Sequence, residues 1–159
     1  LSNNHNSVYP LWSPNGQIVF ARQLGAKSRK YGPANQLFVM NEEGQRISQV
    51  THTKVNPFAQ GLSPLGFSEN GNRLLTEFGG QDQSYAVAVN MVTGKEKALT
   101  NDPEMGFVGA AISPDGTTVL GTTGLGFGGN PHPKVVTVPF TGGKQKVLVK
   151  GAYEPTWGN

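Results

Sequence analysis

The segment Ile112-Ser113-Pro114-Asp115-Gly116 decides the fold, because it combines the end of one strand, a tight turn and the start of the next strand. Proline, an Asx residue and glycine are the residues that tight turns require. The pattern recurs at Trp12-Ser13-Pro14-Asn15-Gly16 and Phe67-Ser68-Glu69-Asn70-Gly71, and Trp157 stands where a fourth copy would begin. The copies follow one another at intervals of about 45 to 55 residues, which indicates an array of similar supersecondary units.

The composition indicates one all-β domain covering residues 1–159. The chain has 36% hydrophobic residues, enough for a core, and its 22 glycines and 11 prolines predict many turns. No segment shows the apolar spacing of a long helix, whereas short apolar runs alternate with Gly, Pro, Asn and Asp. We therefore expect short antiparallel strands joined by turns.

Charge and cysteine content exclude several classes of function. The 13 basic and 10 acidic residues leave a net charge of +3, an excess too small to indicate a nucleic-acid partner. The absence of cysteine excludes disulfides and thiolate metal sites. His5, His52 and His132 lack the spacing of metal ligands, so we expect no metal and no cofactor. No stretch of about 18 apolar residues predicts membrane insertion, and residues 1–5 do not resemble a signal peptide.

Each copy of the pattern opens a unit that predicts four antiparallel strands. The units cover about residues 8–51, 62–100 and 107–149, and residues 152–157 predict a closing strand. Units of this kind are the blades of β-propellers. We therefore predict a β-propeller arc of three four-stranded antiparallel blades plus one strand of a fourth. A β-sandwich is the alternative, although its strands would not recur so regularly.

At these residues the chain resembles the TolB-like family of WD-type propellers. Residues 10–16, with Val39-Met40-Asn41, Gly44 and Val50-Thr51, match the family's repeat, and the other two copies match it less closely. The resemblance covers about residues 8–159 and implies the C-terminal half of a six-bladed ring. It also implies a periplasmic or otherwise extracytoplasmic location. Similar propellers serve as protein-interaction platforms, as gating domains of prolyl-oligopeptidase-like hydrolases and as lyases, so function has to be argued from sites.

An arc of three blades would leave an apolar sheet face bare at each end. Two copies related by a two-fold axis would complete a six-bladed ring, because such a dimer buries the same pair of surfaces twice. The alternative is that further blades of a longer chain complete the ring. The anchors Trp12, Phe67, Ile112 and Trp157 are expected to be buried between adjacent blades.

The longer loops are expected to emerge on one face and to form a binding surface for a protein or peptide. A basic run in the first long loop suits carboxylates or phosphates, and exposed aromatic residues suit protein contacts. The residues predicted to take part are Arg22, Arg29, Lys30, Tyr31, His52, Lys54, Phe58, Phe107, Phe127 and His132.

No catalytic residues are predicted. Ser63, Ser84 and Ser113 lack a nucleophile-elbow motif and a positioned His-Asp pair. The glycine-rich stretch at 124–129 is not followed by a helical pattern, which phosphate-binding loops require. We therefore predict a non-catalytic protein-interaction scaffold. The alternative is a substrate-gating propeller fragment of a larger hydrolase or lyase.

Overall fold

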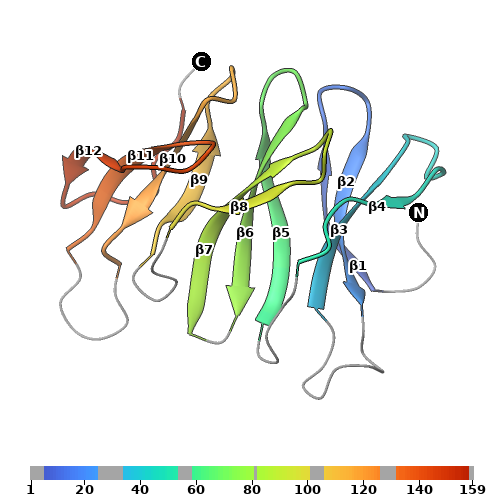
Figure 1. Cartoon of the computed structure of the whole chain (residues 1–159), viewed down its shortest axis with the longest axis horizontal. Coiled ribbons are helices and arrows are strands. Elements are labelled where there is room, and N and C mark those ends of the chain that lie inside the picture. The colour runs from blue at the N-terminus through green and yellow to red at the C-terminus, as the bar shows by residue number, and fades with distance from the viewer. Residues whose placement is uncertain are drawn as a thin grey trace.

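The computed structural model describes residues 6–24, 34–53, 59–80, 82–100, 106–125 and 132–157. Their regular secondary structure consists of strands alone (Figure 1), and they contain no helix long and apolar enough to span a bilayer. The strands fall into three units of four. Unit 1 holds β1 (Ser7–Trp12), β2 (Ile18–Leu24), β3 (Ala34–Met40) and β4 (Ser48–Gln49). Unit 2 holds β5 (Ala59–Phe67), β6 (Arg73–Gly80), β7 (Gln83–Asn90) and β8 (Glu96–Ala98). Unit 3 holds β9 (Val108–Ile112), β10 (Thr118–Thr123), β11 (Lys134–Pro139) and β12 (Lys146–Lys150).

Within each unit, consecutive strands pair in antiparallel fashion, as the sequence predicts. Units 1 and 2 nevertheless share one eight-stranded sheet, because β3 and β5 form a parallel bridge at Asn35 and Gly61. Unit 3 forms a separate four-stranded sheet. The first strands of the three units adjoin one another, since β5 contacts both β1 and β9. We call β1, β5 and β9 the inner strands.

The repeated Ser-x-Asx-Gly motif makes the same turn three times. The serine hydroxyl donates to the Asx side chain two residues later, at 2.7 Å in unit 1, 2.9 Å in unit 2 and 2.6 Å in unit 3. Each turn ends in a glycine with positive φ, a conformation that glycine adopts without strain. In unit 3 the hydroxyl of Ser113 and the backbone and hydroxyl of Thr117 lower the pKa of Asp115 to about 2.

These turns define two ends of the arc. The connections β1–β2 and β3–β4, with their counterparts in the other units, lie at one end, which we call the turn side (top of Figure 1). The ends of β2 and β6 and the starts of β3 and β7 lie at the other end, which we call the loop side. The predicted binding surface belongs to the loop side.

Two apolar cores hold the units together. One lies between units 1 and 2 and the other between units 2 and 3. The first comprises Val19, Ala21, Leu37, Ala59, Leu62, Leu74, Phe78, Val87 and Val89. The second comprises Leu75, Ala86, Ala88, Leu99, Phe107, Ile112, Val119, Val136, Val138 and Phe140. A smaller cluster of Ile18, Phe20, Phe38 and Met40 lies on the other face of unit 1, because neighbouring residues of a strand point to opposite faces.

The anchor residues divide into two kinds. Phe67 packs against the core between units 1 and 2, and Ile112 belongs to the core between units 2 and 3, as predicted. Trp12 and Trp157 are 59% and 38% exposed, so the prediction that they are buried is wrong for this chain. The physical reason for Trp12 is that no sheet among the described residues lies opposite its indole.

The predicted closing strand at 152–157 is also absent, since these residues have no regular secondary structure. The segment still follows unit 3, where the Glu154 N–H donates to Thr122 Oγ1 of β10 at 3.2 Å. Its backbone repeats that of β1. Tyr9 and Glu154 each precede a proline and have φ of 53° and 54°. A strand needs a hydrogen-bonded neighbour, and no strand among the described residues pairs with this segment.

Candidate functional site

Six of the ten predicted binding residues lie outside the described residues. They are Arg29, Lys30, Tyr31, Lys54, Phe58 and Phe127. The other four are Arg22, His52, Phe107 and His132, and no contact among the described residues joins any two of them.

Arg22 lies within β2 rather than in the loop that follows. Its guanidinium carbon lies 5.1 Å from the ring centroid of Phe20 and 4.8 Å from that of Phe38. Its Nε donates to Ser7 Oγ at 3.2 Å. Cation–π contacts of this kind fix the side chain against unit 1, so Arg22 supports the sheet face that Phe20 and Phe38 share.

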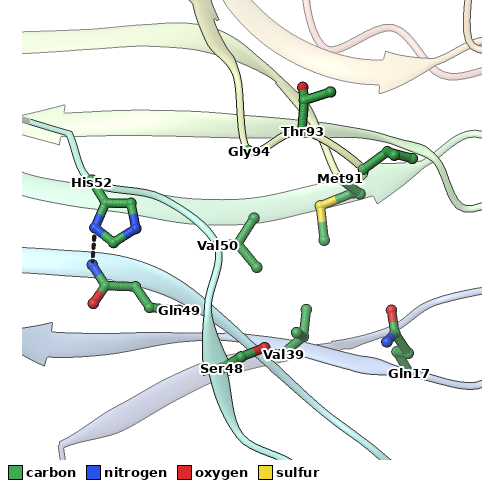
Figure 2. Close-up of a pocket in the computed structure, with 10 residues that line it drawn as sticks. Gln17, Val39, Ser48, Gln49, Val50, His52, Met91, Thr93 and Gly94 are labelled. Carbon is green, nitrogen blue, oxygen red and sulfur yellow. Dashed lines mark hydrogen bonds between the residues drawn. The ribbon is translucent and has the colours of Figure 1, made fainter.

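His52 and His132 are both exposed but lie apart. The Nδ1 of His52 faces the side-chain amide of Gln49 at 3.2 Å, beside the Thr93-Gly94 turn (Figure 2). His132 precedes β11, and its carbonyl lies against Gly124. The described residues contain no group of three or more His, Cys, Asp or Glu side chains that would hold a metal ion.

The prediction for Phe107 is wrong. Phe107 was predicted to line the binding surface, but its exposed fraction is 0% and it belongs to the core between units 2 and 3. Its carbonyl accepts a hydrogen bond from the Ala86 N–H at 2.8 Å, which places it just before β9 and against β7. A large apolar ring at that junction fills the space between two sheets.

The structure points instead to a polar pocket between units 1 and 2, which we call the inner-strand pocket. Its volume is about 180 Å³. Four strands contribute, namely β1, β3, β5 and β6. The lining residues are Tyr9, Asn35, Gln60, Gly61, Ser63, Glu77 and Gly79. Side chains that offer hydrogen bonds therefore converge from both units near the loop side.

Asn35 is the decisive residue of this pocket. Its side chain is only 8% exposed, and its Oδ1 is buried without a hydrogen-bond partner. Leaving a buried acceptor unpaired costs about 1 to 3 kcal/mol, so native proteins rarely retain one without a reason. A bound group that carries an N–H or O–H donor would remove this cost.

Gly61 brings the two units close enough to form the pocket. A Cβ at this position would lie 2.3 Å from the carbonyl oxygen of Asn35 and 2.6 Å from its backbone nitrogen. The φ of Gly61 is +93°, which side-chain-bearing residues rarely adopt. Glycine is therefore required both for the conformation and for the approach of β5 to β3.

Glu77 and Tyr9 complete the chemistry of the pocket. The Glu77 carboxylate accepts a hydrogen bond from the Ser84 hydroxyl and supplies further acceptor sites. Tyr9 is 59% exposed and has a positive φ, so it stands at the pocket's rim. The lining includes no histidine to activate Ser63. The arrangement suits recognition of a group rich in hydrogen-bond donors.

Solved structures with the same arrangement identify the fold. A TolB-type protein from Agrobacterium tumefaciens superimposes with a TM-score of 0.63 at 17% identity, over 89% of this chain and 46% of that chain. TolB from Acinetobacter baumannii gives 0.56 at 21% identity, over 89% and 32%. The fold is that of a TolB-like β-propeller. The propeller of a prolyl endopeptidase structure also matches, with 0.66 at 12% identity, over 94% of this chain and 22% of that chain.

No protein-family model and no curated protein matches the sequence. This propeller chain spans less than half the length of each of the three solved structures. At identities of 12% to 21%, the likeness establishes the fold and leaves the function to the site.

Sequence reasoning missed Asn35, Glu77 and Tyr9 as site residues. Asn35 and Glu77 occupy strands that read as ordinary sheet, and only the pairing of β3 with β5 brings them together. One usable signal was present. Asn35-Gln36 places two amide side chains at the start of an otherwise apolar strand, and buried amides need partners.

Proposed function

We propose that this chain is a non-catalytic protein-interaction scaffold that binds a peptide or protein segment on its loop side. The observation that carries the proposal is the unpaired, buried Oδ1 of Asn35 in the inner-strand pocket. An extended peptide presents backbone N–H groups at regular intervals. Such groups would supply the donor that Asn35 Oδ1 lacks and could bind the acceptor sites of Glu77 that Ser84 does not use. The exposed ring of Tyr9 offers the kind of surface that protein interfaces favour.

The partner is a protein or peptide rather than a nucleic acid. Nucleic-acid sites rely on clustered Lys and Arg side chains, whereas the inner-strand pocket carries one carboxylate and neutral polar groups. The resemblance to TolB-like proteins supports an extracytoplasmic location. The predicted loop residues Arg29, Lys30 and Tyr31 lie outside the described residues, and their part in binding stays a prediction.

The proposed binding is tested with peptides selected from a random library displayed on phage. The affinity of a selected peptide is measured by calorimetry for the wild type, Asn35→Leu and Glu77→Gln. Each variant is expected to weaken binding about fivefold to tenfold, because a hydrogen bond to a buried or charged acceptor is lost. Asn35→Leu is also expected to leave the melting temperature unchanged or higher, since it removes an unsatisfied acceptor.

Glu69→Gln serves as the control, because Glu69 is an exposed carboxylate on the turn side. The proposal would be refuted if the wild type and both pocket variants bound a selected peptide with equal affinity, and if the selected peptides bound the turn side instead of the pocket.

We further propose that a second arc completes the ring, and a second copy of this chain is one candidate. Trp12 at one end and Trp157 at the other, with Tyr153, present apolar surface that another unit would cover. Light scattering over a dilution series tests this. About twice the chain mass, with melting that falls on dilution, is expected for the dimer. A monomer at every concentration would exclude it.

The alternative function is substrate gating in a larger hydrolase or lyase. The prolyl endopeptidase likeness extends over 22% of that chain, as a propeller joined to a larger partner domain would. The coding sequence beyond Asn159 tests the hydrolase form. An α/β-hydrolase pattern there is expected for the gating role, and a stop codon would exclude that arrangement.

A further inference from the structure

Two grooves recur at equivalent junctions of the propeller. In each, the turn after the third strand of one unit lies against the last two strands of the unit before it. Groove 1, between units 1 and 2, has a volume of about 490 Å³ (Figure 2). Groove 2, between units 2 and 3, has a volume of about 370 Å³. Groove 2 is lined by Arg73, Ala88, Asn90, Lys95, Lys97, Phe140 and Thr141.

The two grooves have the same frame but opposite character. When the repeats are aligned, Ser48 of groove 1 corresponds to Lys97 of groove 2, and Met91 corresponds to Phe140. The residues that line groove 1 include no lysine or arginine, whereas groove 2 has three. The frame of groove 1 forms without such cations. The positive charge of groove 2 is therefore not a requirement of the fold.

Arg73 is held in place within groove 2. Its guanidinium carbon lies 5.2 Å from the ring centroid of Phe140, and its Nη1 donates to the Gly116 carbonyl at 2.8 Å. These contacts leave its other N–H donors without a partner among the described residues. A fixed guanidinium with free donors binds a carboxylate at little cost in side-chain entropy.

Lys95, just before β8, and Lys97, within β8, extend the positive surface. Both are exposed, and neither forms an ion pair within the described ranges. The stem of Lys97 lies against Gly142, since a Cβ there would be 2.9 Å from its Cε. Asp115 is attracted to Arg73, but its oxygens accept hydrogen bonds from Ser113 and Thr117. The groove thus keeps an excess of positive charge.

We propose that groove 2 binds an acidic peptide segment. Three cations converge on a groove whose floor includes the buried apolar side chains of Ala88 and Phe140, so the carboxylates of such a segment pair with the cations of the rim. A nucleic acid fits less well, because the Phe140 ring is buried beneath Arg73 and is closed to base stacking. The groove lies on the turn side, away from the inner-strand pocket, so this inference does not rest on the function proposed there.

The test uses a fluorescein-labelled peptide in which Glu alternates with Leu, followed by fluorescence anisotropy. The double variant K95S/K97S removes two of the three cations of groove 2 and leaves Arg73 in place. It is expected to raise the Kd about tenfold at about 50 mM salt, and by less at about 200 mM salt. The double variant K146S/K150S on β12 is the matched control, because it removes the same charge outside both grooves and is expected to leave the Kd nearly unchanged.

Amide chemical shifts locate the peptide independently of the variants. Addition of the peptide is expected to shift the resonances of Asn90 and Thr141. Equal losses in the two double variants, shifts confined to the loop side, or tighter binding of an oligodeoxynucleotide of the same charge would each overturn the proposal.

Discussion

Phe107→Ala is expected to destabilise the fold more than Trp12→Ala, although the sequence predicts that Trp12 is buried and that Phe107 lines a binding surface. Phe107 is fully buried between units 2 and 3, so Phe107→Ala is expected to lower the free energy of unfolding by about 3 to 5 kcal/mol. Trp12 is 59% exposed. Burial of about 40% of an indole surface of about 250 Å² removes about 100 Å² from water, which is worth about 2.5 kcal/mol at most. Since alanine keeps part of that area, we expect a loss of about 1 to 2 kcal/mol.

The assay is urea unfolding followed by circular dichroism, which does not depend on the indole that is removed. It is carried out at a concentration where light scattering shows a single chain. If the chain dimerises, the loss for Trp12→Ala is expected to grow with concentration, because a second copy then covers the indole. A larger loss for Trp12→Ala than for Phe107→Ala in the monomer would refute the description of both cores.

Three further changes test the sheet, the repeated turn and a buried hydroxyl. Gly61→Ala is expected to cost more than about 3 kcal/mol in urea unfolding, because it adds backbone strain to a steric clash with Asn35. Asp115→Asn is expected to reduce the loss of stability between about pH 4 and pH 2, measured as the urea midpoint. The pKa of Asp115 is lower in the folded chain than in the unfolded chain, so its carboxylate stabilises the fold above the unfolded pKa, and this stabilisation is lost as the pH falls through the folded pKa. Thr51→Val is expected to cost about 1 to 3 kcal/mol in thermal unfolding, because Thr51 Oγ1 accepts a hydrogen bond from the buried Leu37 N–H at 2.9 Å.

Each change has an outcome that contradicts its explanation. A Gly61→Ala variant with the same urea midpoint of unfolding as the wild type would contradict the predicted clash with Asn35. For Asp115→Asn the contradicting outcome is a pH dependence that equals or exceeds that of the wild type. A fully stable Thr51→Val variant would mean that the Leu37 N–H finds another acceptor.

The strand order was predictable from the repeats because each Ser-x-Asx-Gly turn is a local structure. Ser113 and Asp115 bond to each other across two residues, so neighbouring sequence contains the whole interaction. Burial was less predictable. Trp12 and Phe67 occupy the same place in their units, but among the described residues only Phe67 packs against a core shared with a neighbouring unit.

The candidate site could not be predicted from the sequence, because it depends on contacts between units. Asn35 meets Gly61 only where β3 and β5 form their single bridge, and Glu77 joins them from β6. The burial of Phe107 also depends on contacts between units, and it could not be predicted from the neighbouring sequence. An aromatic residue after a polar loop reads as exposed, but here the ring fills the space between two sheets.

The two grooves make recognition separable from folding in this chain. Ser48 and Lys97 stand at the same place in successive repeats, so one backbone frame accepts a hydroxyl or an ammonium there. Met91 and Phe140 show the same tolerance for a flexible or an aromatic side chain. These positions form a natural set for combinatorial libraries, in which each junction is given its own ligand preference. A repeat protein diversified in this way would carry several independent specificities on one rigid scaffold.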